Sequence, residues 1–388
     1  MKLFILLSRV PYPLEKGDKL RAFNQIKELS KKHQIILFAL NDDKLDDKAL
    51  RELKKYCEAI SIVNFSKFTI FFNLIRAFFN GNPMQVGYFY FSKAQKKVDE
   101  LIKKHKPDHI YCQLIRTAEY IKKFPHIPKT LDYMDVFSKG IERRISSDSF
   151  CLKPFLVMEY RRLLKYEKKA FTYFNNKTII SEQDKNLIPH SEKNKIVVVP
   201  NGVDTSFFKP IQHKKEFELL FNGNMNYPPN IESVEYLVEK VMPFVWNKLP
   251  HTRLLISGAT PNKTVQDLAS EKVIVTGWVD DIRINFVKSK ILVAPMQISI
   301  GLQNKLLEAM AMQLPCITST LANNALGAKP GEQILVADSP EQYALHIIDL
   351  LQNESKAKQI AMNGYHFVIN NFNWQSTTSI LEKLIYEK

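Results

Sequence analysis

The sequence has no apolar run long enough to cross a membrane. A spanning helix needs about 18 or more consecutive apolar residues, and no segment of the 388 residues reaches that length. The run Leu3–Leu7 is also too short for the core of a secretory signal, and Ser8 and Arg9 follow it without a small-residue cleavage site. We interpret this run as a buried strand of a parallel sheet.

Cysteine is also scarce and has no regular spacing. The cysteines are Cys57, Cys112, Cys151 and Cys316, and no two of them have paired or metal-ligand spacing. This pattern excludes a disulfide framework and a zinc site, and it favours reduced thiols in the core of a cytoplasmic protein. Asp280 and Asp281 are adjacent, so their side chains point apart, and we assign no metal site to them.

Acidic residues are too few to balance the basic ones in the first half of the chain. Residues 1–200 hold 38 Lys and Arg against 22 Asp and Glu, whereas residues 201–388 hold 17 against 18. A polybasic surface is attracted to anionic lipid by about 1 kcal/mol per residue close to the membrane. We predict an anionic membrane surface as a partner of the first half, with ordinary solvated faces as the alternative. No nucleic-acid motif or basic–aromatic platform is present, so we predict no nucleic-acid partner.

The length and the order of elements predict two α/β domains. A chain of 388 residues can bury two cores. Short apolar runs alternate with charged helical stretches, which is typical of parallel sheets covered on both faces. The expected strands are 3–7, 35–40, 60–64, 109–113, 130–133, 177–181, 196–199, 218–221, 253–257, 272–276, 291–294, 316–318 and 333–336. The expected helices include 20–31, 50–57, 91–105, 342–352 and 377–386. We expect one domain over 1–210, joined by a final helix at about 372–388, and a second over 211–371.

One stretch departs from this alternation. Phe65–Phe79 is rich in phenylalanine and has few charges. We favour an interior or acceptor-side helix of the first domain, because a structured helix there would have a sheet to cover. The alternative is a helix lying in a bilayer interface, with Lys67 and Arg76 near the headgroups.

The segment Gly301–Pro315 carries the clearest chemical pattern. A glycine turn leads into an apolar helix, and the backbone amides at such a turn can approach an anion closely. Lys305 adds a cation, and Glu308 supplies a carboxylate that can accept two hydrogen bonds from vicinal hydroxyls. These groups suit a nucleoside diphosphate, with the diphosphate at the turn and the ribose at the carboxylate. The alternative is an ordinary βαβ unit whose helix contains a glutamate.

This segment resembles the nucleotide-sugar motif of the retaining, two-domain glycosyltransferases known as group 4. Further similarity to that family covers nearly the whole chain, in the family's order. The matching segments are Pro11–Arg21, Val199–Asp204 with Phe207, Phe208 and Pro210, Leu220–Gly223, Leu254–Gly258 and Val275–Val279. The first of these resembles a subgroup of sugar transferases from bacterial exopolysaccharide loci.

The resemblance implies the GT-B fold, with two Rossmann-like domains facing each other across a cleft. It implies a retaining glycosyltransferase that moves a sugar from a nucleotide-sugar donor to a saccharide or lipid-linked saccharide in bacterial surface polysaccharide synthesis. The family is metal-independent, so no cofactor is implied beyond the nucleotide-sugar co-substrate. With the charge pattern, this predicts a cytoplasmic enzyme peripheral on the inner face of the membrane.

The resemblance also implies roles for individual residues. Glu308 would bind the ribose, and the amides of the turn before it would face the diphosphate or the sugar. Gly17 would lie against the phosphates, the alternative being a structural turn. The loop after 272–276 would meet the base, although its tryptophan has a packed core position as the alternative. The donor-binding residues so implied are Gly17, Gly223, Asn224, Gly277, Trp278, Val279, Gly301, Leu302, Gln303, Asn304 and Glu308.

Three departures from the family pattern affect the predicted chemistry. Ile300 stands where the family has its first glutamate, which leaves recognition of the donor sugar unassigned. The family's two diphosphate-binding cations are absent near Gly223-Asn224 and Pro229-Asn230. We therefore predict Lys305 as the catalytic cation, with Lys19 and Arg21 in reserve and a solvated helix lysine as the alternative.

The third departure concerns the family's His-Asp pair after a central strand of the first domain. Here Met134 replaces the histidine and Asp135 retains the carboxylate. We predict that Asp135 orients the acceptor or the sugar, the alternative being a cap on the following helix. Two other functions stay open, a nucleotide-sugar epimerase and a non-catalytic nucleotide-sugar-binding partner subunit of the same fold.

Overall fold

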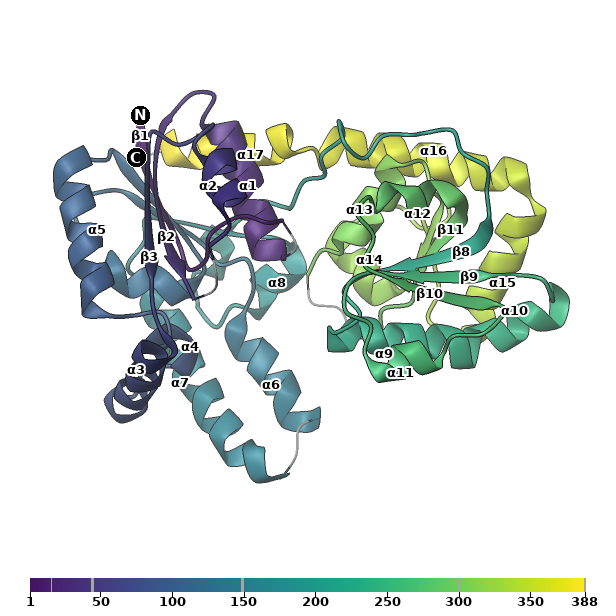
Figure 1. The fold of residues 1–388 in the computed structure, drawn as a ribbon, viewed down its shortest axis with the longest axis horizontal. Helices are drawn as coiled ribbons and strands as arrows, with labels where there is room; N and C mark the ends of the chain where they lie inside the picture. The colour runs from purple at the N-terminus through teal and green to yellow at the C-terminus, as the bar shows by residue number, and fades with distance from the viewer. Residues whose placement is uncertain (15, 43–44, 148–149, 299–300, 387–388) are drawn as a thin grey trace. The chain divides into compact units, whose positions relative to one another are not determined.

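The computed structural model describes the chain except residues 15, 43–44, 148–149, 299–300 and 387–388, and except the side chains of 146–147. Two compact units make up the chain (Figure 1). Unit 1 comprises Met1–Pro200 with Thr377–Lys388, and unit 2 comprises Asn201–Ser376. The chain therefore passes between the units near residues 200 and 376, whereas the sequence predicted passages near 210 and 371.

Unit 1 is built on a parallel sheet with strand order β3-β2-β1-β4-β5-β6-β7. Its strands are β1 Lys2–Leu7, β2 Gln34–Asn41, β3 Ala59–Asn64, β4 His109–Gln113, β5 Lys129–Asp132, β6 Asn176–Ile179 and β7 Val197–Val198. Its helices are α1 Gly17–Leu29, α2 Asp47–Leu53, α3 Lys67–Asn80, α4 Met84–Gly87, α5 Ser92–His105, η1 Ile115–Tyr120, α6 Phe137–Ser147, η2 Phe150–Leu152, α7 Lys153–Phe171, α8 Glu182–Leu187, η3 Lys193–Lys195 and the C-terminal α17 Trp374–Tyr386, whose residues up to Ser376 belong to unit 2.

Both faces of this sheet are covered, as continuous apolar strands require. Alternate residues of β1 belong to different cores, because successive side chains of a strand point to opposite faces. Phe4 and Leu6 pack in one core with residues of α5 and α7. Leu3 and Ile5 pack in the other with residues of α1, α2 and α17, so the C-terminal helix is an integral layer of unit 1.

Unit 2 repeats the architecture with strand order β10-β9-β8-β11-β12-β13, again all parallel. Its strands are β8 Phe217–Asn222, β9 Leu254–Ser257, β10 Val273–Gly277, β11 Ser289–Ala294, β12 Cys316–Thr318 and β13 Leu335–Val336. Its helical segments are α9 Pro228–Tyr236, η4 Leu237–Val241, α10 Met242–Lys248, α11 Lys263–Asp267, α12 Arg283–Lys288, α13 Asn304–Ala311, α14 Thr320–Leu326, α15 Pro340–Gln352 and α16 Glu354–Asn371.

In both units the strand order reverses beside the first strand. The neighbours there are β1 and β4 in unit 1, and β8 and β11 in unit 2. In open parallel sheets, ligands bind outside the carboxyl ends of the strands at such a reversal. The fold therefore directs attention to the loops after these strands. The prediction of two Rossmann-like α/β domains is confirmed, and each expected strand is present with its ends within two residues of the expected ones.

The segment that resembles the family's inter-domain signature has a packing role in unit 2. A Cβ on Gly202 would lie 2.7 Å from the backbone nitrogen of Trp374, so only glycine permits this approach. The next residue, Val203, donates its backbone N–H to the carbonyl of Phe372 at 2.6 Å. The points where the chain enters and leaves unit 2 are thus held side by side.

Two sequence interpretations are wrong. The phenylalanine-rich helix α3 is not an interior helix of unit 1, since Ala77 alone among its residues is buried. Cys151 is exposed, so it is not a core thiol, whereas Cys112 and Cys316 are buried. No helix in the described part of the chain has both the length and the apolar character needed for a membrane crossing.

Candidate functional site

The end of β8 is a tight glycine position in unit 2. Gly223 follows the strand directly and donates its backbone N–H to the carbonyl of Ser257 at 3.0 Å. A Cβ there would lie 2.7 Å from Asn230 Nδ2 and 3.1 Å from Lys305 Nζ. Glycine therefore admits an amide and an ammonium group at the carboxyl end of the strand, beside the reversal of strand order.

Lys305 reaches this point from the first turn of α13. Its Nζ donates to Asn230 Oδ1 at 2.7 Å and lies 4.2 Å from the centroid of the Phe221 ring. The side chain is only 8% exposed, so the alternative of a solvated helix lysine is wrong. Burial lowers the pKa of Lys305 to about 7, opposed by the carboxylate of Glu308. An anion bound beside this ammonium would restore its charge.

The Asn230 carboxamide fixes both the lysine and the loop after β8. Its Oδ1 accepts from Lys305, and its Nδ2 donates to the carbonyl of Asn224 at 2.9 Å. The Asn224 side chain in turn accepts from the backbone N–H of Asn226 at 2.9 Å and from the Thr260 hydroxyl at 3.1 Å. Sequence reasoning noted Asn230 only as a place where a cation is absent, and the structure shows that it orients the cation supplied by α13.

Glu308 lies one turn beyond Lys305 and is half-buried. Burial raises the pKa of its carboxyl group to about 7, opposed by the positive charge of Lys305. In the described part of the chain, no side chain or backbone N–H donates a hydrogen bond to this carboxylate. It therefore keeps its accepting capacity for the hydroxyls of a ligand.

The turn before α13 has the backbone form that the sequence predicted. Gly301 has a φ of 68°, in the left-handed region that favours glycine. Gln303 is the N-cap residue and makes no capping hydrogen bond with its side chain, which instead donates to the carbonyl of Gly301 at 3.3 Å. Leu302 is buried, and the Asn304 side chain accepts from Asn201 Nδ2 at 3.2 Å. The first amides of α13 thus lack a side-chain cap from Gln303.

The ends of β9 and β10 continue the same edge. A Cβ on Gly258, whose φ is 142°, would lie 1.7 Å from the carbonyl oxygen of Gly223, so the two glycines are in backbone contact. Gly258 also donates its N–H to the carbonyl of Gly277 at 3.1 Å. Trp278 is 62% exposed and Val279 is half-buried, so the alternative of a packed core tryptophan is wrong. An exposed indole next to a left-handed glycine can stack on a planar ligand.

In unit 1 the corresponding edge carries Asp135 after β5. This carboxylate is half-buried and accepts from the backbone N–H of Val136 at 2.8 Å. Burial raises its pKa, opposed by that hydrogen bond and by the charges of Arg143 and Arg116. Met134, just before it, has a φ of 56°, a strained value for a non-glycine residue.

Arg116 is a candidate that sequence reasoning missed. It follows β4, and its guanidinium lies 5.3 Å from the Phe89 ring and 4.7 Å from the Phe137 ring. Burial lowers its pKa to about 10, so it is charged at neutral pH. An arginine directly after a central strand was visible in the sequence, but the two rings that hold it come from distant segments. With Asp135, it gives this edge groups of both signs.

Arg21, one of the reserve cations, has a different role. Its Nε donates to Asp132 at 2.6 Å, and both side chains are wholly buried. Tyr111 and Thr178 also donate to Asp132, at 2.7 and 3.0 Å. The arginine is therefore committed to the interior of unit 1, and the prediction that it serves as a reserve phosphate cation is wrong.

Gly17 is the first residue of α1. A Cβ built there meets no atom within 4 Å outside its chain neighbours, and its φ is not in the left-handed region. Neither packing nor a turn requires glycine here, so the alternative of a structural turn is wrong. The approach of Gly17 to the donor phosphates stays a prediction.

A scan against known families adds an independent observation. Residues 216–353 match the family described as glycosyl transferases group 1. The chain carries a glycosyl transferases group 1 domain. The matched range covers most of unit 2, including Gly223, Lys305 and Glu308, so the group 1 domain is the part of the chain that holds these residues.

Similarity to other proteins extends beyond the group 1 domain. The chain is 23% identical over 409 residues to an uncharacterized 44.6 kDa protein in the cps region of Klebsiella pneumoniae, covering 98% of this chain and 99% of that protein. Among solved structures, it resembles sucrose-phosphate synthase from Thermosynechococcus elongatus, with a TM-score of 0.71, 14% identity and coverage of 99% and 98% of the two chains.

HepE from Anabaena, in complex with UDP and glucose, has a TM-score of 0.70 at 13% identity, covering 99% of each chain. A Staphylococcus aureus TarM variant, in complex with fondaparinux, α-GlcNAc-glycerol and UDP, has a TM-score of 0.70 at 12% identity, covering 100% of each chain. These structures confirm the GT-B fold, and the group 1 domain at residues 216–353 confirms the prediction of a glycosyltransferase. Assignment to group 4 stays a prediction.

The structure bears only partly on the remaining predictions for the group 1 domain, which concern Ile300, Asp281 and the donor-binding residues. Ile300, which replaces the family's first glutamate, lies outside the described residues. The Asp281 carboxylate pairs with the Arg283 guanidinium at 2.7 Å, and this ion pair lowers its pKa. The roles of the donor-binding residues and of Asp135 stay predictions, although Gly223, Asn224 and Lys305 do lie together.

Proposed function

We propose that this chain is a retaining glycosyltransferase that uses a nucleotide-sugar donor. Unit 2 would bind the donor, and unit 1 would bind a saccharide or lipid-linked saccharide as acceptor, in bacterial surface polysaccharide synthesis. The observation that carries the proposal is the buried Lys305 ammonium against Gly223 at the reversal of strand order, one helical turn before Glu308. The UDP named in the HepE complex and the cps region of the curated relative support the donor and the pathway class.

The chemistry follows from where charge develops. When the bond between the anomeric carbon and the diphosphate breaks, negative charge grows on the departing phosphate oxygen. Lys305 and the first amides of α13 are preorganised to stabilise that charge, without a metal ion or another cofactor. The acceptor hydroxyl forms the new bond on the same face, and its proton passes to the departing phosphate oxygen. Asp135 would orient the acceptor or the transferred sugar.

The proposed setting is the cytoplasmic surface of a membrane. The excess of basic residues in 1–200 suits an anionic lipid surface, and a lipid-linked acceptor would be presented there. Unit 1, which includes α17, would therefore carry both the acceptor and the peripheral membrane contact.

Two alternative functions can be compared with the proposal on the same residues. A non-catalytic partner subunit is favoured by Ile300 and by the absence of the family's two phosphate cations. The buried Lys305 weakens that argument, because it supplies a cation at the place where the others are missing. A nucleotide-sugar epimerase would need acid and base groups acting on the bound sugar, and it would convert the donor without an acceptor.

The first test is nucleotide recognition by the full chain. We expect calorimetric binding of one member of a panel of UDP-, GDP-, ADP- and CMP-linked sugars. Replacing Glu308→Gln should weaken that affinity about 10- to 100-fold, because the amide keeps only one accepting oxygen and carries no charge, so one charged hydrogen bond is lost. Glu239→Gln, at an exposed glutamate of η4 in the same unit, is the matched control and should leave the affinity unchanged.

Transfer is the second part of the test. Incubation with a membrane extract and the binding nucleotide sugar should yield a product whose anomeric configuration, read by NMR coupling constants, equals that of the donor. Binding without transfer would favour the partner subunit, and a changed donor sugar in the absence of acceptor would identify the epimerase. No binding of any nucleotide sugar, with Glu308→Gln indistinguishable from the wild type, would defeat the proposal.

Nucleotide-sugar affinity should peak near pH 7. The pKa of Lys305 is lowered to about 7, so its cation is lost as the pH rises above that value. The pKa of Glu308 is raised to about 7, so its carboxylate is lost as the pH falls below it. Calorimetry between about pH 5.5 and 8.5 should show both limbs. Glu308→Gln should remove the acid limb and Lys305→Met the alkaline limb, whereas two limbs in both variants would contradict this origin. A nucleotide sugar is a better probe than a free nucleoside diphosphate, because the terminal phosphate of the latter itself titrates near pH 6.

A further inference from the structure

One end of unit 1 exposes an unusual set of large apolar side chains. On α3, Phe68, Phe72 and Phe79 are 78%, 65% and 80% exposed. Phe71, Ile75 and Phe78 of the same helix are also exposed. Single exposed apolar residues are normal, but a contiguous patch of this kind marks an interaction surface.

The exposure is specified by the helix itself. Ser66 caps its start by accepting from the backbone N–H of Thr69 at 3.3 Å, and Gly81, with a φ of 70°, ends it. A Cβ on Gly87 of α4 would lie 2.2 Å from the Cβ of Ala77, so glycine lets α4 pack directly on α3. This contact turns Ala77 inward and leaves the phenylalanines outside.

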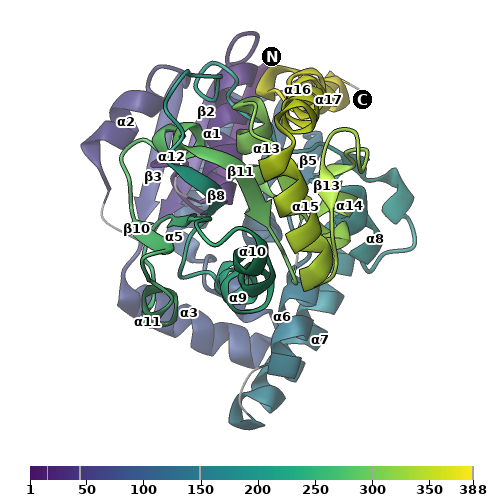
Figure 2. The same ribbon diagram turned by 90° about the vertical axis from the view of Figure 1, so that its right-hand side faces the viewer.

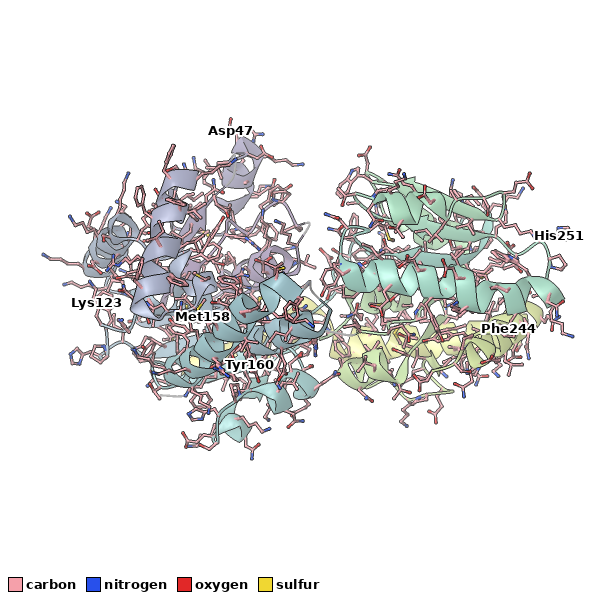
Figure 3. The ribbon with its side chains drawn as sticks, turned by 90° about the horizontal axis from the view of Figure 1, so that it is seen from below. Asp47, Lys123, Met158, Tyr160, Phe244 and His251 are labelled. Carbon is pink, nitrogen blue, oxygen red and sulfur yellow. The ribbon has the colours of Figure 1, made fainter. Side chains whose placement is uncertain are left out.

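A second apolar group lies on η2 and the start of α7, the helix whose Arg162 contacts α3. Phe150 and Leu152 of η2 and Phe155 at the start of α7 are 85%, 47% and 44% exposed. Farther along α7, Arg162 donates to the carbonyl of Phe78 at 2.9 Å, and its guanidinium lies 5.4 Å from that ring. Figures 1 and 2 show α3 and the start of α7 at the same end of unit 1. Figure 3 views the protein from that end, with Met158 and Tyr160 of α7 labelled.

Among the described residues of α3 and α7, the exposed charged side chains are all basic. The helix α3 contains no acidic residue, and its two charged residues, Lys67 and Arg76, are exposed. Arg161 of α7 is exposed as well, and Lys153 is half-buried. Aromatic side chains flanked by basic ones match the apolar interior and the anionic headgroups of a lipid surface.

We propose that the aromatic end of unit 1, formed by α3 and the start of α7, inserts its phenylalanines into the interface of an anionic lipid bilayer. The proposal names the surface for the membrane partner of the proposed function, and in that respect it rests on that function. A second copy of the chain is a poorer occupant, because stacking two aromatic ends would bring Lys67, Arg76 and Arg161 of both copies together.

The test is vesicle sedimentation with the full chain. Phosphatidylcholine vesicles containing about 30% phosphatidylglycerol should bind the wild type, and pure phosphatidylcholine vesicles should bind it more weakly. The double variant Phe72→Ser/Phe79→Ser should bind the anionic vesicles at least about 10-fold more weakly, because two exposed rings no longer enter the interface. Leu345→Ser is the matched control, since Leu345 is 67% exposed on α15 of unit 2, and it should leave vesicle binding unchanged.

Tryptophan fluorescence provides a separate test of whether the phenylalanines enter the lipid. The tryptophans of the chain, Trp246, Trp278 and Trp374, all belong to unit 2, so Phe72→Trp introduces a reporter in unit 1. Its emission should shift to shorter wavelength on adding anionic vesicles and should be quenched by brominated lipid.

Three results would overturn the inference. The first is that the wild type does not bind anionic vesicles. The second is that the Leu345→Ser control loses as much vesicle binding as the double variant. The third is that light scattering shows a dimer of the wild type that Phe72→Ser/Phe79→Ser abolishes. Calorimetry with a nucleotide sugar separates this failure from that of the proposed function. The double variant should bind the nucleotide sugar like the wild type, so a lost vesicle interaction with retained donor binding concerns the aromatic end alone.

Discussion

Replacing Lys305→Met is expected to abolish most of the activity while leaving unit 2 as stable as before or more so. The ammonium group lies beside Gly223, where the donor diphosphate is proposed to bind, and it is 8% exposed. Loss of one preorganised group that stabilises a developing anion costs about 10²–10³ in rate. The stability of unit 2 should stay the same or rise. Burial of this amine already lowers its pKa to about 7, and methionine removes a charge that burial disfavours. Initial rates of transfer and thermal melting of the same preparations measure the two effects.

The control for this experiment is Lys240→Met, which removes an exposed lysine of η4 in the same unit. It should change neither the rate nor the melting temperature appreciably. If Lys305→Met lowered the melting temperature and retained near-normal kcat, the lysine would be structural. The missing phosphate cation would then have to be sought elsewhere.

The largest effect on stability is expected from Arg21→Met. This change leaves the Asp132 carboxylate uncompensated at a position where neither side chain of the pair is exposed. Removing one partner of a buried ion pair costs about 3–5 kcal/mol of the free energy of unfolding. Hydrogen exchange of the β4 and β5 amides should report the loss, because both strands adjoin Asp132.

A nearby ion pair provides the comparison. Arg9 and Asp18 of the same unit lie 3.1 Å apart, with side chains 29% and 14% exposed. Arg9→Met should cost about 1 kcal/mol or less, because solvent screens such pairs. Equal destabilisation by Arg9→Met and Arg21→Met would show that burial does not set the difference. Nucleotide affinity should survive Arg21→Met, since all the predicted donor-binding residues except Gly17 belong to unit 2.

Much of the fold could be predicted because its signals are local. Each parallel strand is a short, continuous apolar run bounded by polar residues, so β1 and β4 were placed within a residue of their ends. Gly223, Gly258 and Gly277 marked the carboxyl ends of three strands, and backbone contacts do join them at one edge. The helix with Lys305 and Glu308 was recognised from the same kind of local pattern.

The partners of these residues could not be predicted, because they depend on tertiary packing. Lys305 and Asn230 are 75 positions apart, and nothing near either one shows that the ammonium group meets the amide. Arg21 follows a glycine loop and looked available for a phosphate, yet Asp132, 111 positions away, engages it. The exposure of α3 was only the less favoured alternative, because apolar residues normally cover a sheet.

Unit 2 is one continuous segment of the chain, inserted between the two parts of unit 1, so it can be exchanged as a whole. Its first and last residues are neighbours, since Gly202 packs on Trp374 and Val203 bonds to Phe372. A recombination that replaces unit 2 joins the new segment to unit 1 at two points that lie close together in space. The sheet of unit 1 and the C-terminal helix that packs on it stay intact. Under the proposed division of roles, in which unit 2 binds the donor and unit 1 the acceptor, one such exchange would transfer donor preference between homologues and leave unit 1 unchanged.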